Sequence, residues 1–222
     1  MGVLAEKKIW DEVFKLAMAE NKKIIESGLL KPADIIEDQL KPILWSVFNT
    51  EGFISATEAS YDSNNKRKKI DMVTMDKDGG IYNIEIKRNC LGLKPWGKTY
   101  SDSKDRYEKD ITKLNSACNE LRDTKKIKGK IFIEVQYFNK TSMRSYKNHK
   151  AELKEKFAGL LREWNNLQCY ELGGPDDVMH SDEKGKICLA MNVWVSEQKT
   201  VEKTPRKIQE NNWSYAGKSL YI

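Results

Sequence analysis

The sequence is poor in the residues that build zinc sites and disulfides, and it has no long apolar run. It contains two histidines and four cysteines without a CxxC pair, so a zinc site is unexpected and the thiols should be reduced. No stretch approaches the roughly 18 apolar residues that cross a bilayer. The first residues lack the apolar core and the small-residue cleavage site of a signal peptide. We therefore expect a cytoplasmic protein with no membrane contact.

The composition instead favours one domain with a basic surface. Hydrophobic residues make up 39% of the 222-residue chain, with six Trp, nine Tyr and six Phe, which is enough for a buried core. Charged residues reach 32%, above the roughly 25% of an average globular protein. The net charge of +6 suits a polyanion partner. We predict one domain over residues 1–222, with its core at 34–138, an N-terminal helix within 1–33, and a helix, a strand and a basic tail within 139–222.

The period of the apolar residues changes several times along the chain, which separates helices from strands. The predicted elements are helices at 5–27 and from about 34, strands at 53–61, 69–75 and 81–87, a helix with an apolar stripe at 107–121, a strand at 130–138, a helix at 145–164, and one or more final strands that include 187–195. The glycines at 173 and 174, followed by Pro175, predict a turn. This order predicts an α/β (α+β) fold, in which a mixed central sheet is flanked by helices on both faces.

Two of these strands should form a hairpin whose register follows from its turn. If the turn is centred on Asp78, paired residues have numbers that sum to 156, so Asp71 lies opposite Glu85. Lys87, two residues beyond Glu85, then points to the same face. The register requires a turn with an odd number of residues, such as one with Gly79 in a left-handed conformation. The same register predicts the pairs Val73 with Asn83 and Met75 with Ile81.

This register places two carboxylates and one ammonium together in the middle of a sheet. Carboxylates so close repel each other unless a cation joins them. Hard oxygen ligands suit Mg²⁺ or Mn²⁺, and Lys87 would orient a water and stabilise negative charge developing on a phosphate. The alternative is a structural one, a surface ladder of salt bridges in which Asp71 and Glu85 pair with Lys87 and Lys69.

The two halves of the hairpin also resemble a known sequence signature. Residues 70–73 (Ile-Asp-Met-Val) and 84–87 (Ile-Glu-Ile-Lys) resemble the Asp … Glu-x-Lys motif of the PD-(D/E)xK nuclease superfamily, with Ile70 where the family name has proline. The predicted order over roughly 34–138 is similar to the αβββαβ core of that superfamily, the restriction-endonuclease-like fold. The resemblance implies a divalent-metal-dependent endonuclease that hydrolyses DNA phosphodiester bonds, in restriction or in another defence or repair role.

The same resemblance implies a role for each residue of the motif. Asp71 and Glu85 would bind Mg²⁺ or Mn²⁺ together with the carbonyl group of Ile86, and Lys87 would be the catalytic lysine. Members of the superfamily often add another acidic residue, from the preceding helix or from the first strand. The candidates in this chain are Glu58, which we favour, and Glu37.

Basic residues near the hairpin supply candidates for holding the substrate. Lys and Arg neutralise phosphates without reading base sequence. The DNA-binding candidates are Lys66, Arg67, Lys68, Lys69, Lys98, Lys104 and Arg106. The expected partner is DNA, double-stranded rather than single-stranded, and a homodimer would fit a double-strand cutter. The alternative to an enzyme is a non-catalytic module that keeps the nuclease fold and binds nucleic acid or a protein.

Overall fold

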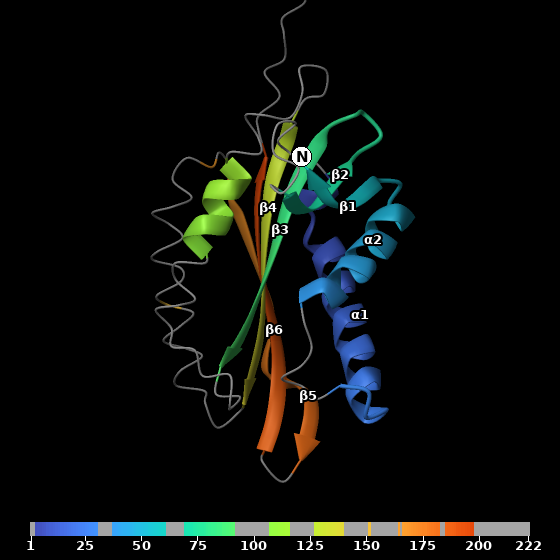
Figure 1. Ribbon diagram of the computed structural model, residues 1–222, viewed down its shortest axis with the longest axis vertical. Coiled ribbons are helices and arrows are strands. Elements are labelled where there is room, and N and C mark those ends of the chain that lie inside the picture. Colours follow the sequence, from blue (N-terminus) through green and yellow to red (C-terminus); the bar gives the residue numbers. More distant parts are fainter. Residues whose placement is uncertain are drawn as a thin grey trace, which may run out of the picture.

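A six-stranded sheet separates two layers of helix in this protein, whose structure is a computed structural model (Figure 1). The residues that the structure describes are 3–30, 37–60, 69–91, 107–115, 127–139, 151, 164, 166–182 and 185–197. The strands are β1 (Ile54–Ser60), β2 (Lys69–Met75), β3 (Ile81–Leu91), β4 (Ile127–Asn139), β5 (Gln168–Asp182) and β6 (Gly185–Glu197). Their order in the sheet is β1-β2-β3-β4-β6-β5, and the pairs are antiparallel except β3 with β4, which is parallel. The predicted mixed sheet is therefore confirmed.

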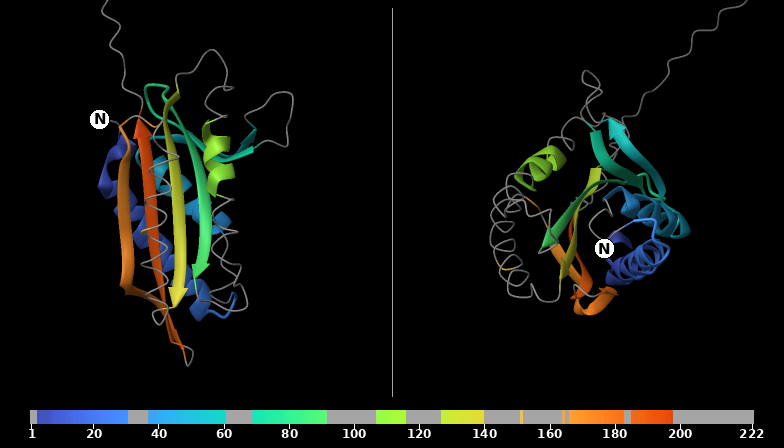
Figure 2. Two further views of the ribbon diagram at one scale, coloured as in Figure 1. Left: turned by 90° about the vertical axis from the view of Figure 1, so that its left-hand side faces the viewer. Right: turned by 60° about the horizontal axis from the view of Figure 1, so that its bottom comes forward.

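Helices cover both faces of the sheet, as the sequence predicts. One face carries α1 (Lys7–Glu26) and α2 (Leu40–Thr50), each preceded by a short 3₁₀ turn, η1 (Val3–Ala5) and η3 (Glu37–Gln39) respectively. The other face carries residues 107–115, the described part of the crossover helix between β3 and β4 (Figures 1 and 2). Across the described ranges, no helix combines the length and the apolar character needed to span a bilayer.

Each helical layer packs on the sheet through apolar side chains. Their helical spacing in the sequence places them on one side of the helix. The larger cluster joins α1 and α2 to the sheet and includes the buried side chains of Trp10, Phe48 and Ile84. The smaller cluster joins residues 107–115 to the opposite face, where the rings of Tyr107 and Phe132 meet edge to face at 5.8 Å. Burial of one such side chain contributes about 1.5–3 kcal/mol, so the crossover helix is held firmly over β3 and β4.

The hairpin between β2 and β3 has the register and the turn that the sequence predicts. Gly79 has a φ of 77°, in the left-handed region that favours glycine. Asp76 closes the turn, because its N–H donates to the carbonyl group of Gly80 at 2.9 Å and its carboxylate accepts from the N–H of Gly80 at 2.7 Å. The observed pairs include Val73 with Asn83 and Met75 with Ile81.

The C-terminal part of the sheet differs from the prediction. The turn predicted at 173–175 is wrong, because these residues lie inside the 15-residue strand β5. The pairing of β5 with β6 shifts between Gly173 and Val178, so the glycines and the proline mark a bulge and not a chain reversal. The helix predicted at 145–164 lies outside the described residues except at positions 151 and 164.

Candidate active site

The sheet forks between β2 and β3 at the two acidic residues of the hairpin. The pairing of these strands extends from the turn as far as Met72 opposite Ile84. Beyond that point β2 stays paired with β1, and β3 stays paired with β4. Asp71 and Glu85 are the next residues on the two arms of the fork, so their side chains stand where the ladder between the strands ends.

The carboxylates of Asp71 and Glu85 take over the main-chain hydrogen bonds at this fork. The N–H of Asp71 donates to Oε1 of Glu85 at 3.1 Å, and the N–H of Ile86 donates to Oδ2 of Asp71 at 2.8 Å. The two acids are therefore in direct contact and are held by the backbone of the facing strand. Glu85 is only 2% exposed, while the side chain of Asp71 is 17% exposed. The pair is buried on the Glu85 side and open on the Asp71 side.

Lys87 lies on the same face as Glu85 and points toward the crossover helix. Its Nζ is 2.8 Å from Oδ2 of Asp110. One turn further along the helix, Nζ of Lys113 is 2.6 Å from Oε1 of Glu85. Asp110 and Lys113 are three residues apart, and therefore neighbours on the helix surface. The helix thus presents an opposite charge to each of the two strand residues, Lys87 and Glu85.

Lys41 reaches the open side of the acid pair from the first turn of α2. Its Nζ lies 2.6 Å from Oδ1 of Asp38 and 3.7 Å from Oδ1 of Asp71, and it also forms an ion pair with Glu58. Burial disfavours the charged form of Lys41, but hydrogen bonds to Asp38 and Glu58 and the charge of Asp71 outweigh that effect and raise its pKa. Lys41 is therefore a permanent cation at the edge of the site.

Of the two acids predicted as additional ligands, the structure describes the side chain of Glu58 but not that of Glu37. Glu58 has a positive φ of 53° and interrupts the pairing of β1 with β2, so its carboxylate faces Lys41 and is linked to Asp71 through that lysine. A non-glycine residue in this region is strained, and such strain gathers at functional sites. Glu37 lies at the start of η3, and its side chain is outside what the structure describes.

Burial and charge give Glu85 an unusual affinity for protons. Removal from water raises the pKa of its carboxyl from the ordinary 4.5 to about 8, and the charge of Asp71 adds to the rise. Lys113 opposes the rise, and Asp110 contributes a smaller increase. Glu85 therefore lies in a site that disfavours its negative charge, although Nζ of Lys113 is 2.6 Å from its Oε1.

A buried polar cluster extends the site along β4. Glu134 is fully buried and pairs with Lys87 in the parallel ladder. Its carboxylate accepts from the hydroxyl of Tyr107 at 2.5 Å, from the amide of Gln136 at 2.7 Å and from the amide of Asn192 at 3.1 Å. These hydrogen bonds position Glu134 beside Lys87 and link the crossover helix to β4 and β6. Buried polar groups are stable when they are hydrogen-bonded in this way.

The structural alternative of a surface salt-bridge ladder does not fit these positions. Glu85 is buried, and Lys87 pairs with Asp110 on the crossover helix. Lys69, the fourth member of the supposed ladder, is exposed at the start of β2. Glu85 is therefore enclosed between the sheet and the crossover helix, so its burial disfavours a solvated row of charges.

Most of the predicted DNA-binding residues lie outside the described part of the chain. Of these candidates only Lys69 is described, and the others are Lys66, Arg67, Lys68, Lys98, Lys104 and Arg106. Sequence reasoning missed the partners Lys41, Asp110, Lys113 and Glu134. A signal for two of them was present, because Asp110 and Lys113 flank the apolar stripe of a helix that must cross over the face bearing Glu85.

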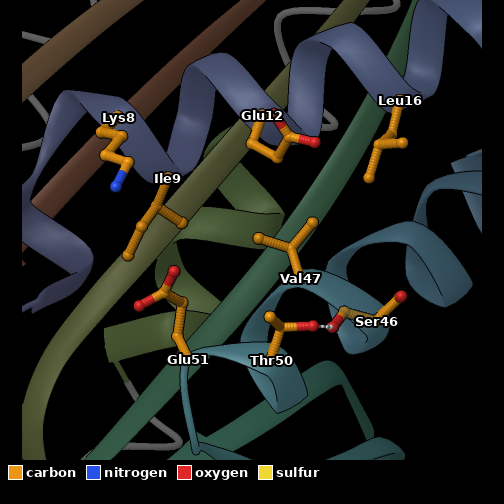
Figure 3. Close-up of a pocket in the computed structure, with 8 residues that line it drawn as sticks. All are labelled: Lys8, Ile9, Glu12, Leu16, Ser46, Val47, Thr50 and Glu51. Atoms are coloured by element: carbon orange, nitrogen blue, oxygen red, sulfur yellow. Dashed lines mark hydrogen bonds between the residues drawn. The ribbon is translucent and has the colours of Figure 1, made fainter.

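The hollow between α1 and α2 lies across the sheet from the site (Figure 3). It has a volume of about 300 Å³ and is lined by Lys8, Ile9, Glu12, Leu16, Ser46, Val47, Thr50 and Glu51. Its charged side chains are ordinary helix-surface residues on separate turns. The contacts of Glu85 and Lys87 lie on the other face, with the crossover helix.

The structure defines the class of fold to which this chain belongs. The chain is a mixed α/β protein with a six-stranded mixed sheet flanked by helices. No known family model, curated protein or solved structure matches it. Among the described residues, no group of three or more His, Cys, Asp or Glu side chains is arranged to hold a metal ion. The carboxylate pair of Asp71 and Glu85 at the fork in the sheet is the candidate site.

Proposed function

We propose that this protein is a divalent-metal-dependent endonuclease that hydrolyses DNA phosphodiester bonds. The observation that carries the proposal is the fork in the sheet, where Asp71 and Glu85 meet with Lys87 on the same face as Glu85. A buried carboxylate such as that of Glu85, next to a second acid, is costly unless a cation is present. The motif resemblance and the order α2, β1, β2, β3, crossover helix, β4 support the assignment to PD-(D/E)xK nucleases.

The donor set at the fork fits a small, hard cation. Mg²⁺ is usually bound by one or two carboxylates and keeps several waters, so a full cage of protein ligands is not needed. Asp71 and Glu85 supply two such carboxylates, and each is oriented by a main-chain N–H of the facing strand. The carbonyl group of Ile86, next to Glu85, is the third proposed ligand. Mn²⁺ has the same preference for oxygen ligands and would fit equally.

Each charged residue of the site then has a chemical task. A bound Mg²⁺ would act as a Lewis acid and provide a water nucleophile at neutral pH. Lys87, held by Asp110 at 2.8 Å, would stabilise negative charge that develops on the scissile phosphate. Lys41, held by Asp38 and Glu58, would supply a positive charge beside Asp71 on the open side of the pair. The net charge of +6 would favour approach of a polyanion.

Within this activity we place double-stranded DNA as the substrate and restriction, defence or repair as the setting. Basic residues at 66–69 lead into the strand β2, which carries Asp71, and we propose that they bind the phosphate backbone of the DNA next to the acid pair. Two copies acting together would supply one site for each strand of a duplex. The competing function is a module that binds nucleic acid or protein without cleaving.

A cleavage assay tests the proposal directly. Supercoiled plasmid, linear duplex and single-stranded DNA are incubated with the protein and with Mg²⁺, Mn²⁺ or EDTA. We expect cleavage that needs the metal, and a loss of about 100-fold or more in Lys87→Ala, because one charge-stabilising group is removed from the transition state. Asp71→Asn should lose activity and Mn²⁺ binding together.

A matched control separates loss of chemistry from loss of general charge. Lys15 on α1 has a side chain 77% exposed, so Lys15→Ala removes the same charge away from the acids and should cleave at the wild-type rate. Cleavage by Lys87→Ala at the wild-type rate would refute the role of that lysine. A wild-type protein that binds DNA but neither cleaves it nor binds Mn²⁺ would establish the non-catalytic module instead.

A further inference from the structure

Two lysines face the acid pair, and they hold it in different ways. Lys41 has a side chain 10% exposed and lies among the three carboxylates of Asp38, Glu58 and Asp71. Lys113 has a side chain 26% exposed, and across the described residues its ion pair is with Glu85 alone. The ammonium of Lys41 is therefore fixed from several sides, whereas that of Lys113 depends on a single partner.

We propose that the ammonium of Lys113 occupies the cation position at Glu85 in the metal-free protein and is displaced when a divalent cation binds. The inference rests on the proposed function and deepens it, since it assigns a task to a residue outside the sequence motif. Its basis is the contact of 2.6 Å between Nζ of Lys113 and Oε1 of Glu85. That contact engages a carboxylate that the metal needs.

When a divalent cation displaces Lys113 from Glu85, the lysine side chain must move and the glutamate side chain must stay. Oε1 of Glu85 also accepts the N–H of Asp71 at 3.1 Å, so this carboxylate is anchored to the facing strand. An ammonium and a divalent cation that approach the same carboxylate repel each other, and the repulsion is strong where water is scarce. The lysine has a flexible four-carbon stem and is partly exposed, so it can turn away by rotamer changes alone.

The helix that carries Lys113 stays in place during this exchange. Tyr107, Ile111 and Leu114 are at most 1% exposed and bind the helix to the sheet face through the smaller apolar cluster. A displaced ammonium therefore remains within a side-chain length of the acid pair. It is then a cation beside the place where a DNA phosphate would bind, and we expect it to contact that phosphate.

Two opposite effects follow from this arrangement. Lys113 should weaken metal binding in the absence of DNA, because the metal must displace it. The same lysine should speed cleavage, because it supports the phosphate once displaced. Replacement of a residue with a purely structural role would not both tighten metal binding and slow cleavage.

The test measures Mn²⁺ binding to the DNA-free protein by isothermal titration calorimetry, followed by DNA cleavage rates. We expect Lys113→Met to bind Mn²⁺ about tenfold more tightly than wild type, because one positive charge near the site is gone. The same variant should cleave DNA about tenfold more slowly at saturating Mn²⁺. Lys113→Arg keeps the charge and should resemble wild type in Mn²⁺ affinity.

The chain offers a matched control on the same helix. Lys109 is exposed one turn earlier, so Lys109→Met makes the same chemical change away from the acid pair and should leave Mn²⁺ affinity within twofold of wild type. Equal Mn²⁺ affinity in Lys113→Met and Lys109→Met, with wild type still binding Mn²⁺ through Glu85, would overturn the inference and leave the proposed function standing. A wild-type protein that binds no Mn²⁺ would overturn both.

Discussion

Replacement of Glu85 by glutamine should change how the stability of the protein depends on pH. The folded protein holds the Glu85 proton up to about pH 8, whereas an ordinary glutamate releases it near 4.5. Between these values the folded state binds more protons than the unfolded state, so stability must fall as pH rises. Each pH unit in this interval corresponds to about 1.4 kcal/mol. Between pH 6 and pH 9 wild type should lose about 2–3 kcal/mol from this group, most of it below pH 8.

The measurement is guanidinium unfolding of wild type and Glu85→Gln at pH 6, 7, 8 and 9 in EDTA. Asp71, Lys113, Asp110, Lys87 and the other charges that surround position 85 are the same in both proteins, so the difference between the two pH profiles isolates the carboxyl. We expect wild type to lose stability relative to the variant as the pH rises. Added Mg²⁺ should remove much of that loss, because a cation stabilises the ionised carboxylate. If the stability of both proteins in EDTA changes with pH in the same way, the raised pKa of Glu85 is refuted.

Two further changes test the positioning of Lys87 and the hairpin turn. Asp110→Asn should slow DNA cleavage about tenfold in initial-rate assays, because it removes the carboxylate 2.8 Å from Lys87, while Mn²⁺ affinity changes by less than threefold. Gly79→Ala should cost about 1–2 kcal/mol in guanidinium unfolding, because φ is 77° there although space for a methyl group exists. Gly174→Ala, which has the same space without the positive φ, is the control, and a larger loss in that variant would contradict the explanation.

The hairpin could be predicted from the sequence because its geometry is local. The turn at 77–79 sets which residues are opposite, and the two-residue period of a strand carries that register along both arms. Asp71 and Glu85 therefore meet as predicted, with Lys87 on the same side as Glu85. Their roles in metal binding and catalysis remain predictions. The prediction did not contain the fork itself, since strand pairing alone gives no sign of where two strands part.

The partners of the acid pair depend on contacts between segments far apart in the sequence. Lys41 and Lys113 come from helices on opposite faces of the sheet, so their approach to one site depends on how both layers pack. The strand β5 was missed for a similar reason. Its Gly-Gly-Pro segment has the composition of a turn, but pairing with β6 outweighs that local preference and absorbs the extra residues as a bulge.

The packing of α1 has a consequence for the way the chain folds. The side-chain amide of Asn21 in α1 donates a hydrogen bond to the hydroxyl of Tyr137, 116 residues later. The hydroxyl of Tyr170 donates to the carbonyl group of Ala5, just before α1, across 165 residues. α1 therefore cannot complete its packing before residues 137 and 170 have been synthesised. Closing such long loops is slow, so α1 should become ordered together with β4 and β5, late in folding. A fragment limited to residues 34–138 would lack both α1 and the strands on which it rests.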